Sequence, residues 1–95
     1  MSTLYGIYGI GGCGRGIMPI ARQQLSSRSG VRLLFIADGA SGETVNGNEV
    51  LTLDAFMAVP ADGKNIAIAI ASPQSRQAVA ERCRAAGASF FEVRA

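Results

Sequence analysis

Short apolar runs, bounded by glycine, serine or aspartate, recur along the chain and predict buried strands. Residues 65–71 are apolar at nearly every position, which is typical of a central strand covered on both faces. Residues 40–48 are small and polar and predict a loop with a turn at Asn46–Gly47, and 49–51 predict a very short edge strand. The predicted main strands are 4–9, 31–37, 65–71 and 90–93.

Helical spacing of apolar residues follows the first strand. It predicts a helix over residues 12–25. Pro19 lies inside this helix and removes a hydrogen bond to the Arg15 carbonyl, so we expect a kink near 15–19 or a loosened first turn. The residues expected on its buried face are Cys13, Ile17, Ile20, Ala21 and Leu25.

A second helix is predicted after the central strand. Ser72 and Pro73 form a favourable N-cap and first helical position, and Gly87 supplies the stop. Residues 53–57 predict a single helical turn. The apolar face of the second helix is expected to hold Val79, Cys83 and Ala86.

This order of elements predicts an α/β fold: a small, Rossmann-like parallel sheet with helices on both faces. Right-handed crossovers place the first strand and the 65–71 strand side by side at the centre. The expected strand order across the sheet is 31–37, 4–9, 65–71, 90–93. A chain of 95 residues corresponds to one domain, over residues 1–95.

Composition narrows the class of function. The net charge of +2 is spread along the chain and aromatic residues are only 6%, which argues against a nucleic-acid-binding face. The chain has no histidine and two cysteines without a paired motif, so neither a zinc site nor the commonest general base is expected. No apolar stretch is long enough to span a membrane, and no export segment begins the chain. Two unpaired thiols then favour the cytoplasm.

A glycine-rich motif directly follows the first strand and opens the first helix. Each glycine has its own role: Gly9 permits the tight turn, Gly11 lets a phosphate approach the backbone, and Gly14 lets the helix pack closely on the sheet. Free amides and the positive end of the helix dipole attract an anion there. The alternative is a plain tight turn that binds nothing. The motif is Gly9-Ile10-Gly11-Gly12-Cys13-Gly14.

Further candidates lie where other strands end. Asp38, before Gly39, can accept hydrogen bonds from a ribose, a base or a sugar, or it can be a solvated turn residue. Ser72 offers a polar edge, although an N-cap role alone explains it. Arg15 can pair with a phosphate or remain solvated. Without a histidine to activate it, a catalytic Cys13 is not expected. No catalytic or metal residue is predicted, and the predicted binding residues are Gly9, Gly11, Gly12, Cys13, Gly14, Arg15, Asp38, Gly39, Ala71 and Ser72.

The size of the domain bears on the ligand. A dinucleotide needs two mononucleotide-binding halves, and this chain has one, so a mononucleotide or nucleotide-sugar fits better than NAD. Two alternatives remain. One is the NAD(P)-binding half of an oxidoreductase, which uses the same loop and Asp38. The other is a regulatory or interaction module that binds no nucleotide.

Several blocks of the sequence resemble one known domain. The blocks are Tyr8–Arg15, Phe35–Asp38, Val45–Leu51 and Ile68–Ser72. Together they look like the N-terminal domain of bacterial sugar acyltransferases of the sialic-acid O-acetyltransferase and UDP-4-amino-sugar N-acetyltransferase type. The resemblance covers essentially the whole chain, and only its glycine block is specific.

This resemblance implies a nucleotide-sugar-binding domain, with a UDP-sugar as the expected partner. Gly11 to Gly14 would meet the diphosphate, and Asp38 would lie near the nucleoside. In that family a left-handed β-helix domain forms homotrimers, binds acetyl-CoA and carries the catalytic histidine. Nothing in these 95 residues matches that second domain, so we expect no cofactor in this chain and acetyl-CoA as the cofactor of the parent enzyme.

Overall fold

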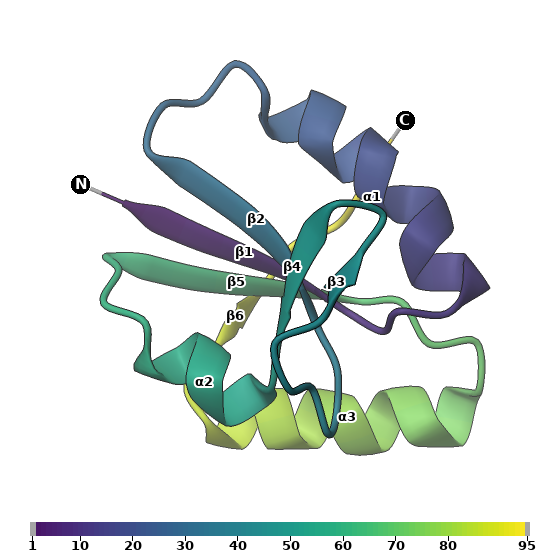
Figure 1. Ribbon diagram of the computed structural model, residues 1–95. Helices are drawn as coiled ribbons and strands as arrows, with labels where there is room; N and C mark the ends of the chain where they lie inside the picture. The colour runs from purple at the N-terminus through teal and green to yellow at the C-terminus, as the bar shows by residue number, and fades with distance from the viewer. Residues whose placement is uncertain (1, 95) are drawn as a thin grey trace.

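A six-stranded sheet lies between helices on its two faces in the computed structural model, which describes residues 2–94 (Figure 1). The strand order is β3-β4-β2-β1-β5-β6. Its strands are β1 (Thr3–Tyr8), β2 (Val31–Ile36), β3 (Thr44–Val45), β4 (Asn48–Leu51), β5 (Gly63–Ile68) and β6 (Ser89–Phe90). The helices are α1 (Gly12–Leu25), α2 (Leu53–Ala58) and α3 (Pro73–Ala85).

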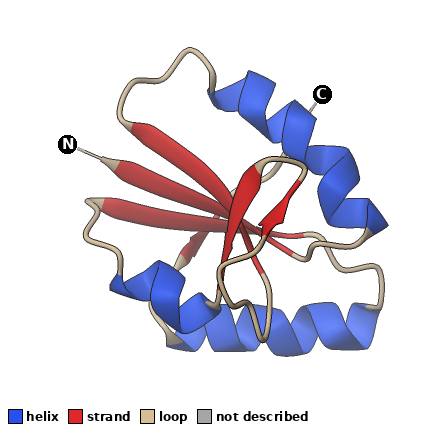
Figure 2. Cartoon of the chain, viewed as in Figure 1, coloured by secondary structure: helices blue, strands red, loops and turns tan. Residues whose placement is uncertain are grey.

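The predicted α/β class and the order of the main strands are confirmed. Strands β2, β1, β5 and β6 are neighbours and pair in parallel. The short strand expected at residues 49–51 is β4, which pairs with β2 in parallel, but it is not at the edge because β3 lies outside it. Figure 2 shows α1 on one side of the sheet and α2 with α3 on the other. This arrangement follows from right-handed crossovers between parallel strands.

The prediction of an unbroken loop over 40–48 is wrong. Thr44–Val45 form β3, which pairs antiparallel with β4, so the sheet is mixed at this edge. Asn46 and Gly47 both have positive φ, 50° and 78°, as a two-residue hairpin turn requires. A strand of two residues is too short to show hydrophobic periodicity, and only its pairing defines it.

The bounds of β1 and β2 agree with the prediction to within one residue, whereas those of β5 and β6 differ by more. β5 begins at Gly63 and ends at Ile68 because it pairs residue for residue with β1, which ends where the chain turns at Gly9. Residues 69–71 therefore lie beyond the strand. β6 ends at Phe90, earlier than expected. The Phe91 amide still donates to the Ile66 carbonyl, but Glu92 and Arg94 form their backbone hydrogen bonds with Gln24 of α1 instead.

Successive side chains of β1 enter two separate cores. Leu4 and Tyr8 pack on the side of α2 and α3, whereas Ile7 packs on the side of α1. Both cores consist mainly of buried aliphatic and aromatic side chains, including Tyr8, together with Cys83, and no charged side chain among the described residues is buried. Hydrophobic burial on both faces is what a strand of almost uniform apolar composition predicts.

The buried face of α1 is only partly as predicted. Cys13 is exposed and Ile17 and Ile20 are half-buried, whereas Ala21 and Leu25 are buried as expected. The helical spacing of the sequence also fits a buried face shifted by one residue, and close packing at Gly14 selects this second face. The buried residues of α1 are therefore Gly14, Met18, Ala21 and Leu25. Likewise Ala86, expected on the apolar face of α3, is exposed because the helix ends at Ala85.

Pro19 lies inside α1, and the helix is assigned continuously from Gly12 to Leu25. Its exposed position keeps the proline ring out of the core. The expected kink or loosened turn stays a prediction.

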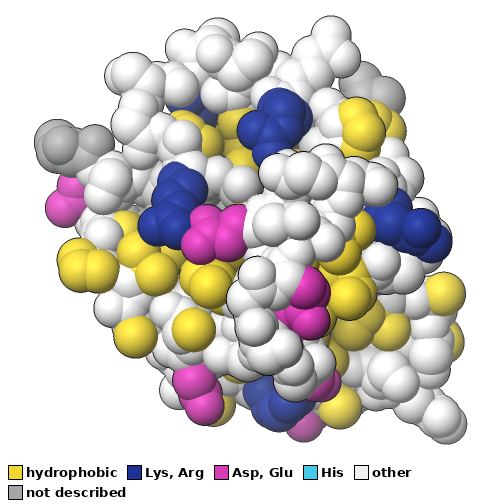
Figure 3. All heavy atoms as spheres, in the orientation of Figure 1, with side chains coloured by type: hydrophobic (Ala, Val, Ile, Leu, Met, Phe, Trp, Pro, Cys, Tyr) yellow, Lys and Arg dark blue, Asp and Glu magenta, His cyan; other side chains and the backbone are white. Residues whose placement is uncertain are grey.

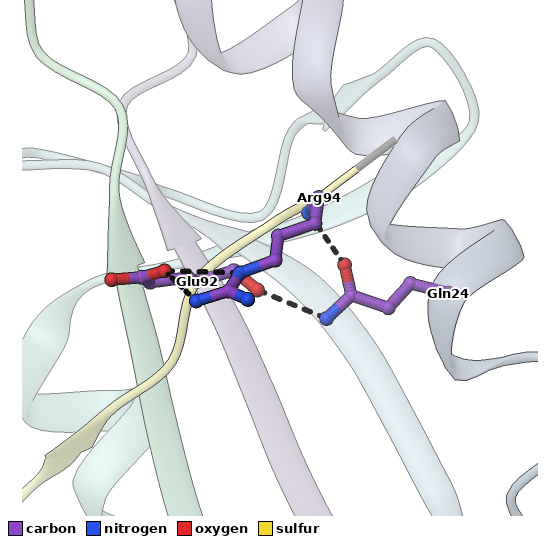
Figure 4. Close-up of polar contacts among 3 residues, drawn as sticks. All are labelled: Gln24, Glu92 and Arg94. Carbon is purple, nitrogen blue, oxygen red and sulfur yellow. Dashed lines mark hydrogen bonds and ion pairs between the residues drawn. The ribbon is translucent and has the colours of Figure 1, made fainter.

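Gln24 of α1 forms hydrogen bonds with the C-terminal segment (Figure 4), and Val93 of that segment packs against the core on the α1 side. The side-chain amide of Gln24 donates to the Glu92 carbonyl over 2.9 Å, and its oxygen accepts from the Arg94 backbone amide over 2.7 Å. The amide group therefore pairs with the extended segment as a neighbouring strand would. Phe91, whose ring meets Tyr5 edge-on at 4.9 Å, anchors the same segment.

We expect Gln24→Ala to release residues 92–94 from α1 with a global loss of only about 1 kcal/mol. Both hydrogen bonds end on exposed backbone, so water replaces them at low cost. Amide hydrogen exchange should become faster at Arg94 and stay unchanged in β1. The neighbouring Gln23, which is exposed, provides the matched control Gln23→Ala. Unchanged exchange at Arg94 would contradict this account.

Candidate functional site

The turn from β1 into α1 is tight because two of its positions exclude a side chain. Gly9 has φ +124°, and a Cβ there would lie 2.7 Å from the Ala69 carbonyl oxygen. A Cβ on Gly14 would lie 2.8 Å from the Gly9 carbonyl carbon and closer still to its oxygen. The predicted conformational roles of Gly9 and Gly14 are thus confirmed.

The start of α1 is open. Gly11 is the N-cap, its backbone is extended, and no side chain within residues 2–94 caps the helix there. A Cβ on Gly11 or Gly12 would meet nothing within 4 Å, and both residues are exposed, as is the free thiol residue Cys13. Because the first amides of a helix have no partner within it, these donors can meet an anion from outside.

The parallel strands bring three chain segments to the same edge of the sheet. Tyr8 is in register with Ile36 on one side and Ile68 on the other. The amide of Gly9 donates to the Ile36 carbonyl and the amide of Ala69 to the Tyr8 carbonyl, each over 2.9 Å. The glycine turn, the segment at Asp38 and the segment leading to Ser72 therefore start from adjacent strand ends.

The remaining predicted residues are more dispersed. Ser72 is the N-cap of α3 and accepts from the Ser75 amide over 3.4 Å, as its N-cap interpretation predicted. Ala71 and Gly39 are exposed. Arg15 is exposed and, with Arg22, lines a hollow of about 240 Å³ against the β3–β4 turn. Arg15 thus borders the hairpin side of α1.

A polar cluster surrounds Asp38. The Tyr8 hydroxyl donates to Asp38 Oδ1 over 2.5 Å. Arg82 Nη2 donates to the same hydroxyl oxygen over 2.9 Å and to Asp38 Oδ2 over 3.3 Å. The three residues come from β1, the segment after β2, and α3. Of these three residues only Asp38 is among the predicted binding residues, because the position of Tyr8 within a strand and of Arg82 within a helix carries no local signal of a site.

Charge and burial shift the acidities in this cluster. Burial, followed by the hydrogen bond to Asp38, raises the pKa of Tyr8 to about 12. The hydrogen bond from Tyr8 lowers the pKa of Asp38, with Arg82 adding to the effect. The pKa of Arg82 is raised, chiefly by its hydrogen bond to Asp38. At neutral pH, Asp38 is an anion and Tyr8 keeps its proton.

A hollow of about 360 Å³ lies beside this cluster. The segment after β2, the start of α2 and the end of α3 line this open hollow. Its volume is in the range of small-molecule sites. The residues that line it include Asp38, Gly39, Thr52, Asp54 and Arg82.

Other kinds of site find no support in the described part of the chain. Residues 2–94 contain no group of three or more potential metal-ligating side chains. None of their helices is long and apolar enough to cross a bilayer. Acidic and basic side chains alternate over the face seen in Figure 3, without an extended area of one sign.

A mostly parallel sheet with a glycine turn at its carboxyl edge defines a Rossmann-like α/β domain. No family model matches the chain. Over 81 residues it is 41% identical to GDP-perosamine N-acetyltransferase of Escherichia coli O157:H7, covering 83% of this chain and 37% of that protein.

Solved structures give the same relationship. WeeI from Acinetobacter baumannii AYE superimposes with a TM-score of 0.91 at 36% identity, over 99% of this chain and 44% of that one. The acetyltransferase domain of PglB from Neisseria gonorrhoeae FA1090, solved with acetyl coenzyme A, superimposes with a TM-score of 0.70 at 21% identity. This match covers 93% of this chain and 42% of that one. The last likeness concerns the fold alone.

This chain is thus related in sequence and fold to a part of bacterial sugar N-acetyltransferases, which confirms the resemblance seen in its sequence. It spans less than half the length of the proteins it matches. The oxidoreductase alternative gains no support from these comparisons.

Proposed function

We propose that this chain binds the nucleotide-sugar substrate of an acetyl-CoA-dependent sugar acetyltransferase. In this proposal, acetyl transfer takes place in another part of the whole protein. The observation that carries the proposal is the open start of α1, where Gly11 and Gly12 leave backbone amides uncovered beside the strand ends. The relationship to a GDP-perosamine N-acetyltransferase supports it.

The diphosphate would accept hydrogen bonds from the amides of Gly11 to Gly14, favoured by the positive end of the α1 dipole. The absence of a Cβ at Gly11 lets the phosphate approach the backbone. Asp38 would accept hydrogen bonds from the nucleoside, with Gly39 beside it, and the Ala71–Ser72 segment would border the other side. Arg15 would add positive charge near the phosphates.

Two forms of this proposal differ in the base of the nucleotide, which is either uracil or guanine. The sequence resemblance implies a UDP-sugar, whereas the curated relative is named for GDP-perosamine. Acetyl-CoA and a homotrimeric parent remain expectations for the whole protein, and acetyl coenzyme A is bound in the related PglB domain.

Calorimetric titration with UDP, GDP and NAD tests the proposal. We expect UDP or GDP to bind and NAD not to bind, because one mononucleotide-binding half is present. Binding of NAD alone, or of none of the three, would overturn the proposal.

Gly11→Ser should weaken nucleotide binding at least tenfold, about 1.4 kcal/mol, without loss of stability. Serine is a good N-cap, so its hydroxyl takes an amide hydrogen that the phosphate needs. Gly16 lies further along the same helix, and a Cβ added there would meet nothing within 4 Å, so Gly16→Ser is the matched control. Equal affinities of Gly11→Ser and wild type, measured by titration, would exclude the amides of α1 from the site.

A further inference from the structure

We propose that Tyr8 and Arg82 are positioning residues, which hold Asp38 as the acceptor for hydrogen-bond donors on the nucleoside half of the ligand. The inference rests on the nucleotide binding proposed above and adds two residues to it. Neither residue belongs to the glycine motif, and both are joined to Asp38 only by the tertiary structure.

The hydrogen bonds of this cluster run toward Asp38. The Tyr8 hydroxyl has one proton, which it gives to Asp38 Oδ1, and Arg82 has only donors, which it gives to Tyr8 and to Asp38 Oδ2. Each carboxylate oxygen therefore accepts one bond from the protein. A carboxylate offers about four acceptor positions, so capacity remains on both oxygens.

Tyr8 and Arg82 restrain the Asp38 carboxylate. The Asp38 side chain is 69% exposed and follows the end of β2, where a lone carboxylate would rotate freely. Tyr8, by contrast, is 3% exposed and fixed in the core beneath it. Arg82 reaches the pair from α3, with its guanidinium carbon 5.8 Å from the centre of the Tyr8 ring. Two donors from two rigid elements thus fix one exposed carboxylate.

The cluster lies at the edge of the sheet that carries the glycine turn. Asp38 and Arg82 both line the 360 Å³ hollow, and Asp38 follows the strand adjacent to the glycine turn. An exposed ion pair contributes little to stability, so stabilisation alone gives a weak account of this arrangement. A preorganised acceptor at the edge where nucleotides bind in α/β sheets explains why a buried tyrosine directs its hydroxyl to a surface carboxylate.

The test measures the affinity of GDP and UDP by titration calorimetry for the wild type, Tyr8→Phe, Arg82→Gln, Asp38→Ala and the double variant Tyr8→Phe/Asp38→Ala. For the nucleotide that binds the wild type, we expect Tyr8→Phe and Arg82→Gln each to lower the affinity about fivefold, and Asp38→Ala to lower it about tenfold. Tyr8→Phe should cause no further loss once Asp38 is alanine, because Tyr8 acts through Asp38.

Tyr5→Phe is the matched control. Tyr5 lies on the same strand and its hydroxyl accepts from Arg28 over 2.8 Å. Because side chains alternate along a strand, Tyr5 and Tyr8 lie on opposite faces of the sheet. The affinity of the Tyr5→Phe variant for the nucleotide should equal that of the wild type. Thermal unfolding of every variant checks that the domain is folded.

The outcomes separate the two proposals. If neither GDP nor UDP binds the wild type, the proposed function fails. If a nucleotide binds but Asp38→Ala or Tyr8→Phe retains wild-type affinity, the positioning role is overturned. Additive losses in the double variant also overturn it, because Tyr8 would then act independently of Asp38.

Discussion

Gly14→Ala is expected to lower the free energy of unfolding by about 3 kcal/mol. The added Cβ would lie 2.8 Å from the Gly9 carbonyl carbon and nearer to its oxygen, and both atoms belong to the backbone. Neither atom can rotate away as a side chain would. Either α1 moves off the sheet or the turn after β1 opens, and both changes disturb the proposed phosphate site. Urea unfolding followed by circular dichroism measures the loss.

Gly16→Ala is the control for this effect. Gly16 lies in the same helix, is exposed, and has nothing within 4 Å of an added Cβ. Alanine in a helix interior is more favourable than glycine by about 0.5–1 kcal/mol, so this variant should be slightly more stable than the wild type. If the two variants had equal stability, close packing at Gly14 would not be the reason for a glycine there.

Phe56→Ala is expected to cost about 3–5 kcal/mol, a large part of the stability of a domain of this size. Phe56 is fully buried and is the only buried residue of α2. Its ring fills the space above Gly6 of β1, where a Cβ would lie 2.8 Å from it. Without this ring, only the partly buried Leu53 and Met57 hold α2 against the core, and the start of α2 lines the hollow beside Asp38.

Phe90→Ala is the comparison for that substitution. Phe90 is 42% exposed in β6 and has the Arg84 guanidinium over its ring at 5.7 Å. We expect a loss of about 1 kcal/mol, from partial burial and this cation–π contact. Thermal and urea unfolding of both variants should therefore separate them clearly. A loss at Phe90 as large as that at Phe56 would contradict the assignment of the core.

The candidate site was predictable where its residues share a local motif. The glycines at positions 9 and 14 lie five residues apart, and their spacing alone indicates a turn from strand to helix with close packing. Asp38 was predictable because it ends a strand whose neighbour carries the motif. Tyr8 and Arg82 were not, because 74 residues separate them and their contact depends on how α3 crosses the sheet.

The sequence by itself determined the α/β class, the order of the main strands, and both ends of α1, because apolar runs, glycine turns and caps act over a few residues. Only the tertiary structure decided the antiparallel β3, the buried stripe of α1, the length of β5 and the Tyr8–Asp38–Arg82 cluster. Strand pairing, helix rotation and side-chain contact depend on partners far along the chain. Local patterns therefore leave them open until the elements pack.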